Sequence, residues 1–123
     1  MAYRVLLVED SSTMRAFVTA ALESAGGFEV TEARNGFEAL RLLPRGPFDV
    51  IVTDINMPDI NGLEMIKTVR GSPQYQHTPL IIISTEGHDR DRERGLALGA
   101  SEYLVKPFAP EALVAAVRRL LGA

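Results

Sequence analysis

The sequence contains no cysteine and no excess of basic residues. Without cysteine, the chain can have no disulfide framework, thiolate zinc site, iron–sulfur cluster or thiol nucleophile. Lysine and arginine number 13 against 16 acidic residues, for a net charge of −3, so the basic surplus typical of a free-standing nucleic-acid-binding protein is missing. No apolar run approaches the ~20 residues that cross a membrane, and the first residues lack the layout of a signal peptide. We therefore expect a cytoplasmic protein that binds neither nucleic acid nor membranes.

The length and composition are those of one globular domain. The chain has 123 residues, of which 46% are apolar and 24% charged, and an ordinary domain has about 100–150 residues. Neither an internal repeat nor a linker-like segment divides the sequence. We expect residues 1–123 to form a single domain.

Strand-like and helix-like patterns alternate along the chain. Short, continuous apolar runs predict strands buried on both faces at 5–8, 50–52 and 80–83, and two further strands are predicted at 28–33 and 103–105. Apolar residues at three- and four-residue steps predict helices that begin at Ser11 or Ser12, around 39–43, at 63–70, at 89–98 and at Pro110. This alternation predicts an α/β fold of the (βα)5 kind, with a doubly wound parallel sheet covered by helices on both faces.

Polar and charged residues follow the predicted strands where each strand ends. In chain order they are Glu9 and Asp10, Asp54 and Asn56, Ser84 and Glu86, and Lys106. Because the carboxyl ends of parallel strands meet at one edge of a sheet, we expect these side chains to converge there.

Three carboxylates at one edge repel one another, so their ionised forms are costly unless positive charge offsets them. A divalent cation and Lys106 would balance the charges of Glu9, Asp10 and Asp54. A few oxygen ligands with room for water suit Mg²⁺ better than Ca²⁺. A metal ion, an ammonium group and the Ser84 hydroxyl also suit a phosphoryl group, whose charge spreads over its oxygens. An aspartate carboxylate can itself accept that group as an acyl phosphate.

Several short motifs stand at these strand ends and in the turns between them. They are Val8-Glu9-Asp10, residues 52–58 around Asp54, Asn61-Gly62, Ser84-Thr85-Glu86, Gly99-Ala100 and residues 103–108. Together, and in this order, they resemble the response-regulator receiver domains of the CheY type over essentially the whole chain. The resemblance implies a flavodoxin/CheY-like five-stranded sheet with strand order 2-1-3-4-5, and a single receiver domain over residues 1–123.

The resemblance also implies roles for the acidic residues. Asp54 is expected to accept a phosphoryl group from a phosphohistidine of a sensor histidine kinase. Asp10 and Asp54 are expected to bind Mg²⁺ directly, with Glu9 acting through a water molecule and the backbone carbonyl of Asn56 as a further ligand. Glu9 is a mild departure from the family pattern, since many relatives have aspartate at this position, and it keeps the chemistry.

Further residues are expected from the same resemblance to hold the phosphoryl group and to pass the signal on. Lys106 and Ser84 would hold the phosphoryl oxygens, and Ser84 stands where many relatives have threonine. Tyr103 would be the rotameric switch. Asn56 and Glu86 would tune dephosphorylation. The Lys106–Pro107 peptide bond is expected to be cis.

The same resemblance predicts the protein's partners. They are a sensor histidine kinase and a target protein that binds the helix at 89–98, the strand carrying Tyr103 and the C-terminal helix, and a phosphatase is a further candidate. Ser84-Thr85-Glu86 and residues 106–111 are most like chemotaxis receivers. Such a protein catalyses its own phosphorylation and dephosphorylation and has no separate substrate.

The same residues also bear on other functions. Ser11-Ser12-Thr13 is a weak sign of a flavin or nucleotide carrier, but the adjacent acids repel phosphate and no glycine-rich loop follows. A Mg²⁺-dependent phosphohydrolase needs an acid two residues after its nucleophile, where Asn56 stands. A receiver used only as a scaffold would lack a site residue, and none is missing. The alternative that this chain is a receiver domain excised from a larger regulator stays open.

The assigned residues and segments also have ordinary structural interpretations. Asp54 could cap the loop that follows it, and Glu9-Asp10 could be a helix start with favourable charge near the helix dipole. Tyr103 could be simple strand packing, Lys106 a solvated lysine, and the alternating charges of residues 89–94 a solvated helix face.

Overall fold

The computed structural model describes residues 2–57, 59–85 and 89–122. The strands are β1 (Tyr3–Val8), β2 (Phe28–Ala33), β3 (Val50–Asp54), β4 (Leu80–Ser84) and β5 (Glu102–Val105). The helices are α1 (Ser12–Ala25), α2 (Gly36–Leu42), α3 (Gly62–Gly71), α4 (Asp89–Leu98) and α5 (Pro110–Leu121), and a 3₁₀ turn covers Leu43–Arg45. Every strand pair is parallel, and the order in the sheet is 2-1-3-4-5. The predicted fold class and strand order are confirmed.

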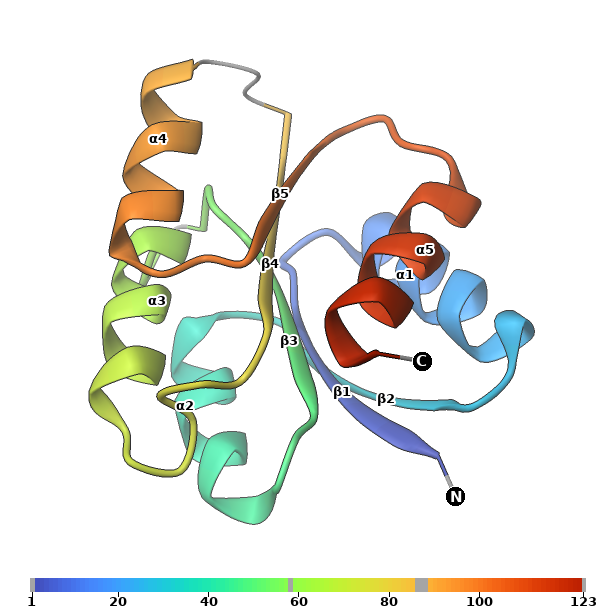
Figure 1. Ribbon diagram of the computed structural model, residues 1–123, viewed down its shortest axis with the longest axis horizontal. Helices are drawn as coiled ribbons and strands as arrows, with labels where there is room; N and C mark the ends of the chain where they lie inside the picture. The colour runs from blue at the N-terminus through green and yellow to red at the C-terminus, as the bar shows by residue number, and fades with distance from the viewer. Residues whose placement is uncertain (1, 58, 86–88, 123) are drawn as a thin grey trace.

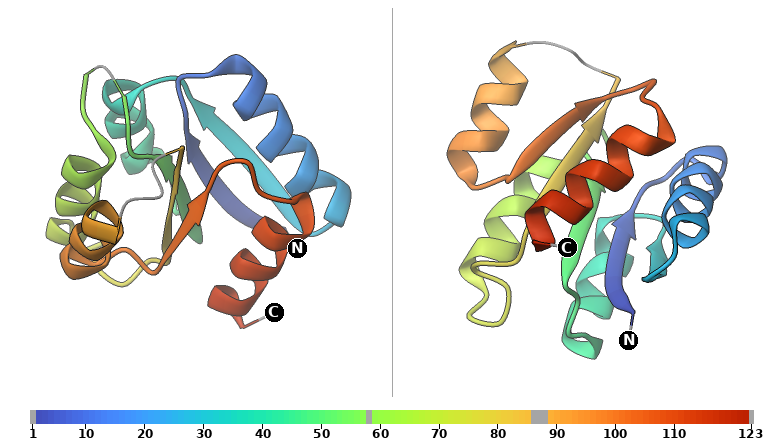
Figure 2. Two further views of the ribbon diagram at one scale, coloured as in Figure 1. Left: turned by 90° about the horizontal axis from the view of Figure 1, so that it is seen from above. Right: turned by 45° about the vertical axis from the view of Figure 1, so that its right-hand side comes forward.

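The sheet is the middle of three layers (Figures 1 and 2). Helices α1 and α5 cover one face, and α2, α3 and α4 cover the other. Side chains alternate between faces along a strand, so Val5 and Leu7 join the core beneath α1 and α5, while Leu6 and Val8 join the opposite core. This two-sided burial explains why the sequences of β1, β3 and β4 contain continuous apolar runs rather than alternating patterns.

The register of the strands brings their carboxyl ends to one edge. Val8 pairs with Thr53, Asp54 with Ile83, and Ser84 with Val105. The residues that follow β1, β3, β4 and β5 therefore lie side by side, as the sequence predicts.

Asparagine and serine side chains set three of the helix starts. The Ser11 hydroxyl accepts a hydrogen bond from the Met14 N–H at 3.2 Å, so Ser11, and not Ser12, caps α1. The Asn35 and Asn61 side chains accept from the third residue of the helices that follow them, at 2.8 and 2.9 Å. Each bond satisfies a donor that has no partner within its own helix.

Two further sequence expectations meet the structure at peptide bonds and helix ends. The Lys106–Pro107 bond is cis, as expected, and Gly46–Pro47 is a second cis bond that the sequence did not indicate. The short helix α2 ends at Leu42, and Pro44 lies within the 3₁₀ turn that follows it. No helix among the described residues is long and apolar enough to span a membrane.

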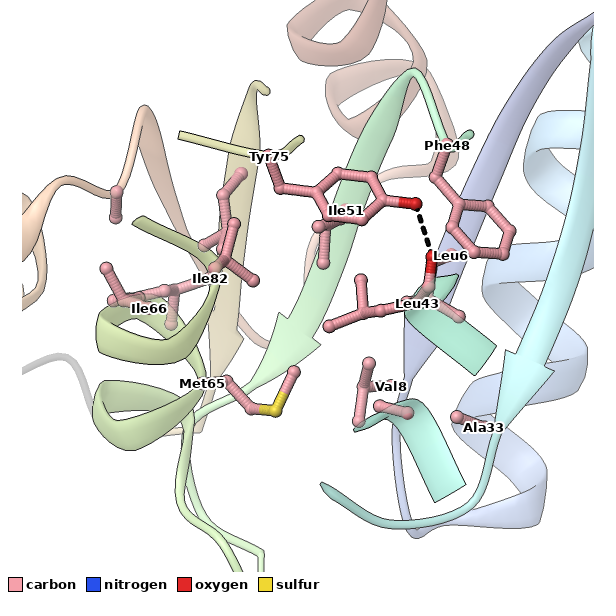
Figure 3. Close-up of a cluster of buried hydrophobic side chains, with 14 of the residues drawn as sticks. Leu6, Val8, Ala33, Leu43, Phe48, Ile51, Met65, Ile66, Tyr75 and Ile82 are labelled. Carbon is pink, nitrogen blue, oxygen red and sulfur yellow. Dashed lines mark hydrogen bonds between the residues drawn. The ribbon is translucent and has the colours of Figure 1, made fainter. Parts of the chain in front are cut away.

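The loop at 72–79, at the edge opposite the site, is anchored in the core by one residue, Tyr75. Its Tyr75 side chain is 2% exposed, and its hydroxyl donates to the Leu43 carbonyl at 2.6 Å (Figure 3). Arg70, at the end of α3, donates to the carbonyls of Tyr75, Thr78 and Gly99 at 2.7–3.0 Å. One guanidinium thus holds the segments before β4 and β5 together, which fixes the strands that carry the site.

Candidate functional site

Three carboxylates converge at the carboxyl edge of the sheet. Glu9 and Asp10 follow β1 and Asp54 ends β3, and each offers an oxygen within 4.8 Å of the others. Glu9 is fully buried, Asp54 is 5% exposed and Asp10 is exposed. The convergence predicted from the strand ends is therefore present in the geometry.

Lys106 brings a positive charge to two of these acids. Its Nζ lies 2.7 Å from Glu9 Oε1 and 3.6 Å from Asp54 Oδ1, and its side chain is mostly buried. The second Glu9 oxygen accepts from the Ser11 N–H at 3.0 Å, and Asp54 Oδ1 lies 3.4 Å from the Asn56 N–H. The ammonium group therefore bridges the two buried carboxylates, and its shorter contact is with Glu9.

Lys106 alone does not offset the cost of ionising the two buried carboxylates. Burial raises the pKa of Glu9 and of Asp54, and in both cases it outweighs the lowering effect of Lys106. The two buried carboxylates lie together with the exposed carboxylate of Asp10. The three form a set of oxygen donors that is open to solvent on the side of Asp10. This chemistry fits a hard divalent cation such as Mg²⁺.

Ser84 ends β4, the strand next to the one that Asp54 ends, and Tyr103 lies one strand further on, in β5. Ser84 is buried at the end of β4, where its carbonyl accepts from the Lys106 N–H at 2.7 Å. Tyr103 is 6% exposed and belongs to the core cluster that includes Ile82. The ring thus occupies an inward position in this structure. Glu86, expected to tune dephosphorylation, lies outside the described residues.

Gly62 allows α3 to begin directly against the site loop. A Cβ atom at this position would stand 2.6 Å from the Ile55 Cα and 2.7 Å from the Asp54 carbonyl oxygen. The Gly62 N–H donates to the Ile55 carbonyl at 2.9 Å. Asn61-Gly62 is one of the motifs on which the resemblance to receiver domains rests. The geometry explains its glycine, because any side chain at this position would collide with the backbone of Asp54 and Ile55.

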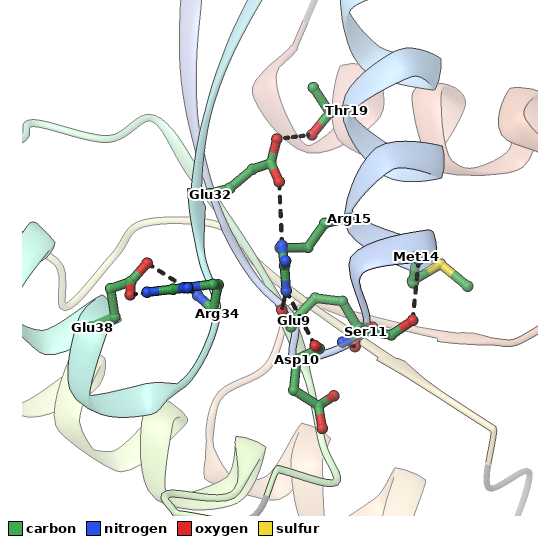
Figure 4. Close-up of polar contacts among 9 residues, drawn as sticks. All are labelled: Glu9, Asp10, Ser11, Met14, Arg15, Thr19, Glu32, Arg34 and Glu38. Atoms are coloured by element: carbon green, nitrogen blue, oxygen red, sulfur yellow. Dashed lines mark hydrogen bonds and ion pairs between the residues drawn. The ribbon is translucent and has the colours of Figure 1, made fainter.

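Arg15 is a residue of this region that the sequence patterns did not single out. Its guanidinium donates to the backbone carbonyls of both Glu9 and Asp10 (Figure 4). The available signal was an arginine in the first turn of the helix that follows the two acids. Such a signal is weak, because an arginine near a helix start is usually solvated.

One hollow of the described surface lies away from these acids. It has a volume of about 890 Å³, lies between α1 and α5, and is lined mainly by small and apolar residues such as Phe17, Ala21 and Val114. The acidic cluster is instead at the open edge of the sheet. An edge of this kind suits a small ion and a group presented by another molecule better than an enclosed organic substrate.

Comparisons with known proteins agree with this fold. The family model of the response regulator receiver domain matches residues 5–118. A chemotaxis protein CheY homolog of Campylobacter jejuni is 40% identical over 97% of this chain and 92% of its own length. The structure of Vibrio cholerae chemotaxis protein CheY4 superposes with a TM-score of 0.93 at 41% identity, over 98% of this chain and 100% of that one.

A third relative is informative about the metal. The receiver domain of a Pseudomonas aeruginosa sensor histidine kinase matches with a TM-score of 0.90 at 29% identity, over the full length of both chains, and that structure has a magnesium ion coordinated in its active-site cleft. Receivers of this kind are signalling switches and not classical enzymes. With the family model covering most of its length, this chain belongs to the response regulator receiver domain family and is of the CheY type.

Proposed function

We propose that this receiver accepts a phosphoryl group on Asp54 from the phosphohistidine of a sensor histidine kinase, and that the modified form binds a target protein differently. The observation that carries the proposal is the position of Asp54. It ends the central strand, beside two further carboxylates and 3.6 Å from the Lys106 ammonium group. The surroundings of Asp54 thus combine a nucleophile, ligands for a cation and a fixed positive charge.

The residues that would hold Mg²⁺ are Glu9, Asp10, Asp54 and the backbone carbonyl of Asn56. The donor chemistry of the three carboxylates supports this assignment, and the magnesium-bound relative adds weight to it. When bound, Mg²⁺ supplies positive charge to the oxygens of the phosphoryl group and of Asp54. Asp10 is the exposed member, so it is expected to contact the ion most directly, while Glu9 remains paired with Lys106.

The proposed transfer is a nucleophilic displacement at phosphorus. An oxygen of ionised Asp54 forms a bond to phosphorus, and the bond between phosphorus and the histidine nitrogen breaks. The electron pair of that bond stays on the imidazole, which takes up a proton if it has become the anion. Lys106 is proposed to stabilise the phosphoryl oxygens. Its Nζ already lies 3.6 Å from Asp54 Oδ1, so a small movement would bring it to those oxygens. Water later cleaves the acyl phosphate, and Asn56 and Glu86 are proposed to tune that rate.

The signal is proposed to pass through Ser84 and Tyr103. The Ser84 hydroxyl is expected to bond to the phosphoryl group, and the inward position of the Tyr103 ring is then favoured over an outward one. Helix α4 lies against this ring, since a Cβ on Gly95 would stand 2.7 Å from Ile82 Cδ1 and 3.9 Å from Tyr103 Cδ2. A movement of the ring is therefore transmitted to the surface formed by α4, β5 and α5.

That surface carries exposed apolar groups for a partner. Leu96 of α4 is 42% exposed and Val105 of β5 is 41% exposed. We propose that a target protein binds here, with a phosphatase as a further partner, and that the protein acts in the cytoplasm as a single receiver domain. Because these relatives are chemotaxis proteins, we propose that this protein acts in a motility pathway. A phosphohydrolase that turns over small esters is disfavoured, because Asn56 offers no acid beside the nucleophile.

The proposal is tested by mass spectrometry of the intact protein after incubation with phosphoramidate and Mg²⁺. The parent should gain one phosphoryl group, and the gain should disappear in excess EDTA. Asp54→Asn should gain none. Asp59→Asn is the matched control, because Asp59 lies on the same loop but its carboxylate accepts from the Gly36 and Phe37 N–H groups at 3.3 and 3.0 Å. A phosphoryl group on Asp54→Asn, or its loss from Asp59→Asn, would contradict the assignment.

A further inference from the structure

Arg15 binds the backbone of the loop that carries two of the acids. Its Nη1 donates to the Glu9 carbonyl at 2.9 Å and to the Asp10 carbonyl at 3.1 Å (Figure 4). Its side chain is only 15% exposed. The planar guanidinium presents several N–H donors in a rigid arrangement, which allows it to serve two carbonyls and a further partner at once.

The guanidinium is itself held by Glu32 of β2, and that carboxylate is held in turn by Thr19 of α1. Arg15 Nε lies 3.3 Å from Glu32 Oε1 on β2, and the second Glu32 oxygen accepts from the Thr19 hydroxyl on α1 at 3.1 Å. Figure 4 shows the resulting line of contacts from Thr19 through Glu32 and Arg15 to the loop after β1. The Glu9 N–H already donates to the Ala33 carbonyl of β2 at 3.0 Å, and Arg15 adds an attachment of the Glu9 and Asp10 carbonyls to β2 and α1.

This attachment matters most for Asp10. The Asp10 carboxylate is exposed, whereas Glu9 is buried and bonded to Lys106. Packing therefore fixes Glu9, while the direction of the Asp10 side chain depends on its backbone. A loop that can rotate about Asp10 would present its carboxylate to a cation only part of the time, and apparent affinity falls with that fraction.

We propose that Arg15 is a positioning residue for the metal site: it holds the Glu9–Asp10 backbone so that Asp10 faces the cation, and Mg²⁺ binding and Mg²⁺-dependent phosphorylation both depend on it. The inference rests on the proposed function of the acidic cluster and adds to it a residue that touches neither the ion nor the phosphoryl group.

Simple electrostatics predicts the opposite sign. Arg15 carries a positive charge close to the proposed cation, so removing that charge should strengthen Mg²⁺ binding if charge alone mattered. Positioning predicts that Mg²⁺ binding weakens. Arg15→Lys separates the two effects further, because it keeps the charge and loses the rigid set of donors.

The experiment measures the Mg²⁺ dissociation constant of the full chain by NMR titration, together with the phosphorylation rate from phosphoramidate as a function of Mg²⁺. Arg15→Gln should weaken Mg²⁺ binding by about tenfold, the low end for residues that orient metal ligands, and Arg15→Lys by a smaller factor. Phosphorylation should slow at low Mg²⁺ and recover to within about twofold of the parent when the site is saturated, as expected when binding and not the chemical step is impaired.

Arg34→Gln and Arg34→Lys are the matched controls. Arg34 pairs with Glu38 at 3.4 Å, and its side chain is 71% exposed, so the same charge changes there should leave the Mg²⁺ dissociation constant within about twofold. A purely structural role for Arg15 would lower the melting temperature without moving this constant. If Arg15→Gln does not fold, Arg15→Lys carries the test.

The Mg²⁺ titrations distinguish a failure of the Arg15 positioning role from a failure of the proposed function. If the parent binds Mg²⁺ and the Arg15 variants bind it equally well or more tightly, the positioning role is wrong and the proposed function stands. If the parent itself binds no Mg²⁺, both the positioning role and the metal-dependent function are overturned. Weaker binding in both Arg15 variants, with unchanged Arg34 controls, supports the proposal.

Discussion

Replacing Asp54 by asparagine should make the metal-free protein more stable. Asp54 is 5% exposed, and its carboxylate lies within 4.8 Å of Glu9 and 3.6 Å from the Lys106 ammonium group. At an effective dielectric constant of about 20, a carboxylate at the 4.8 Å limit repels Asp54 by about 3.5 kcal/mol, and Lys106 attracts it by about 4.6 kcal/mol. The attraction offsets one such repulsion, while the repulsion from the exposed Asp10 and the cost of burying the charge remain. Burying an ion costs several kcal/mol and a hydrogen-bonded amide less, so we expect a gain of about 1–3 kcal/mol.

The pH dependence of this gain has a definite sign. The pKa of Asp54 is raised in the folded protein, chiefly by burial, so the folded state binds the proton more tightly than the unfolded chain does. Ionisation therefore costs stability: the cost is absent below the unfolded pKa of about 3.9, appears as the pH rises, and is complete above the folded pKa. The advantage of Asp54→Asn should be largest above the folded pKa and should vanish below the unfolded one.

Urea unfolding in EDTA, repeated with saturating Mg²⁺, provides the assay. A ligand at 100 times its dissociation constant stabilises the folded state by about 2.7 kcal/mol, so Mg²⁺ should close much of the gap by stabilising the parent, while the variant, which has lost a ligand, gains less. Asp49→Asn is the control, since the Asp49 carboxylate accepts from the Arg4 N–H at 2.7 Å; the same change of charge there should cost about 1 kcal/mol. A metal-free Asp54→Asn protein less stable than the parent would refute the reasoning.

Three further predictions concern the framework that holds the site. Arg70→Met leaves three backbone carbonyls without their donor and should cost about 3 kcal/mol in urea unfolding; a loss under about 0.5 kcal/mol would show that other donors replace it. Gly62→Ala drives a methyl group against the backbone at Asp54 and should cost about 1–3 kcal/mol and slow phosphorylation, so a variant equal to the parent in both would contradict the close approach. Burial is the largest single effect on the pKa of Asp59 and raises it, but the backbone N–H groups that bond to its carboxylate, Phe37 first, together outweigh burial and lower the pKa. Asp59→Asn should therefore destabilise most at neutral pH, and the difference should shrink as the pH falls through the folded pKa; a difference that does not change with pH would count against these bonds.

The sequence predicts the fold well because its information is local. Continuous apolar runs such as residues 80–83 identify strands buried on both faces, and helical spacing identifies the layers above and below. Because parallel strands share one carboxyl edge, the strand ends alone then assign Glu9, Asp54 and Lys106 to that edge. The predicted convergence of these residues is confirmed by the geometry, while their roles in phosphorylation stay predictions.

Contacts between distant parts of the chain were not predictable in this way. Residues 71–79 have the pattern of a plain loop, yet Tyr75 is buried and bonds to Leu43, 32 residues away. Arg15 of α1 contacts Glu32 of β2, and no periodic pattern marks a pair of this kind. Sequence patterns report which face a residue occupies, and they do not report which single side chain it meets across the fold.

The most direct test of the switch is an NMR comparison of the protein with and without phosphoramidate and Mg²⁺. We expect amide shifts at Asp54 that extend through Ser84 and Tyr103 to the exposed surface of α4. In Ser84→Ala, phosphorylation of Asp54 should persist while the shifts at Tyr103 and α4 become much smaller. Shifts confined to the immediate neighbours of Asp54 in the phosphorylated parent would contradict the proposal that phosphorylation changes the partner-binding surface.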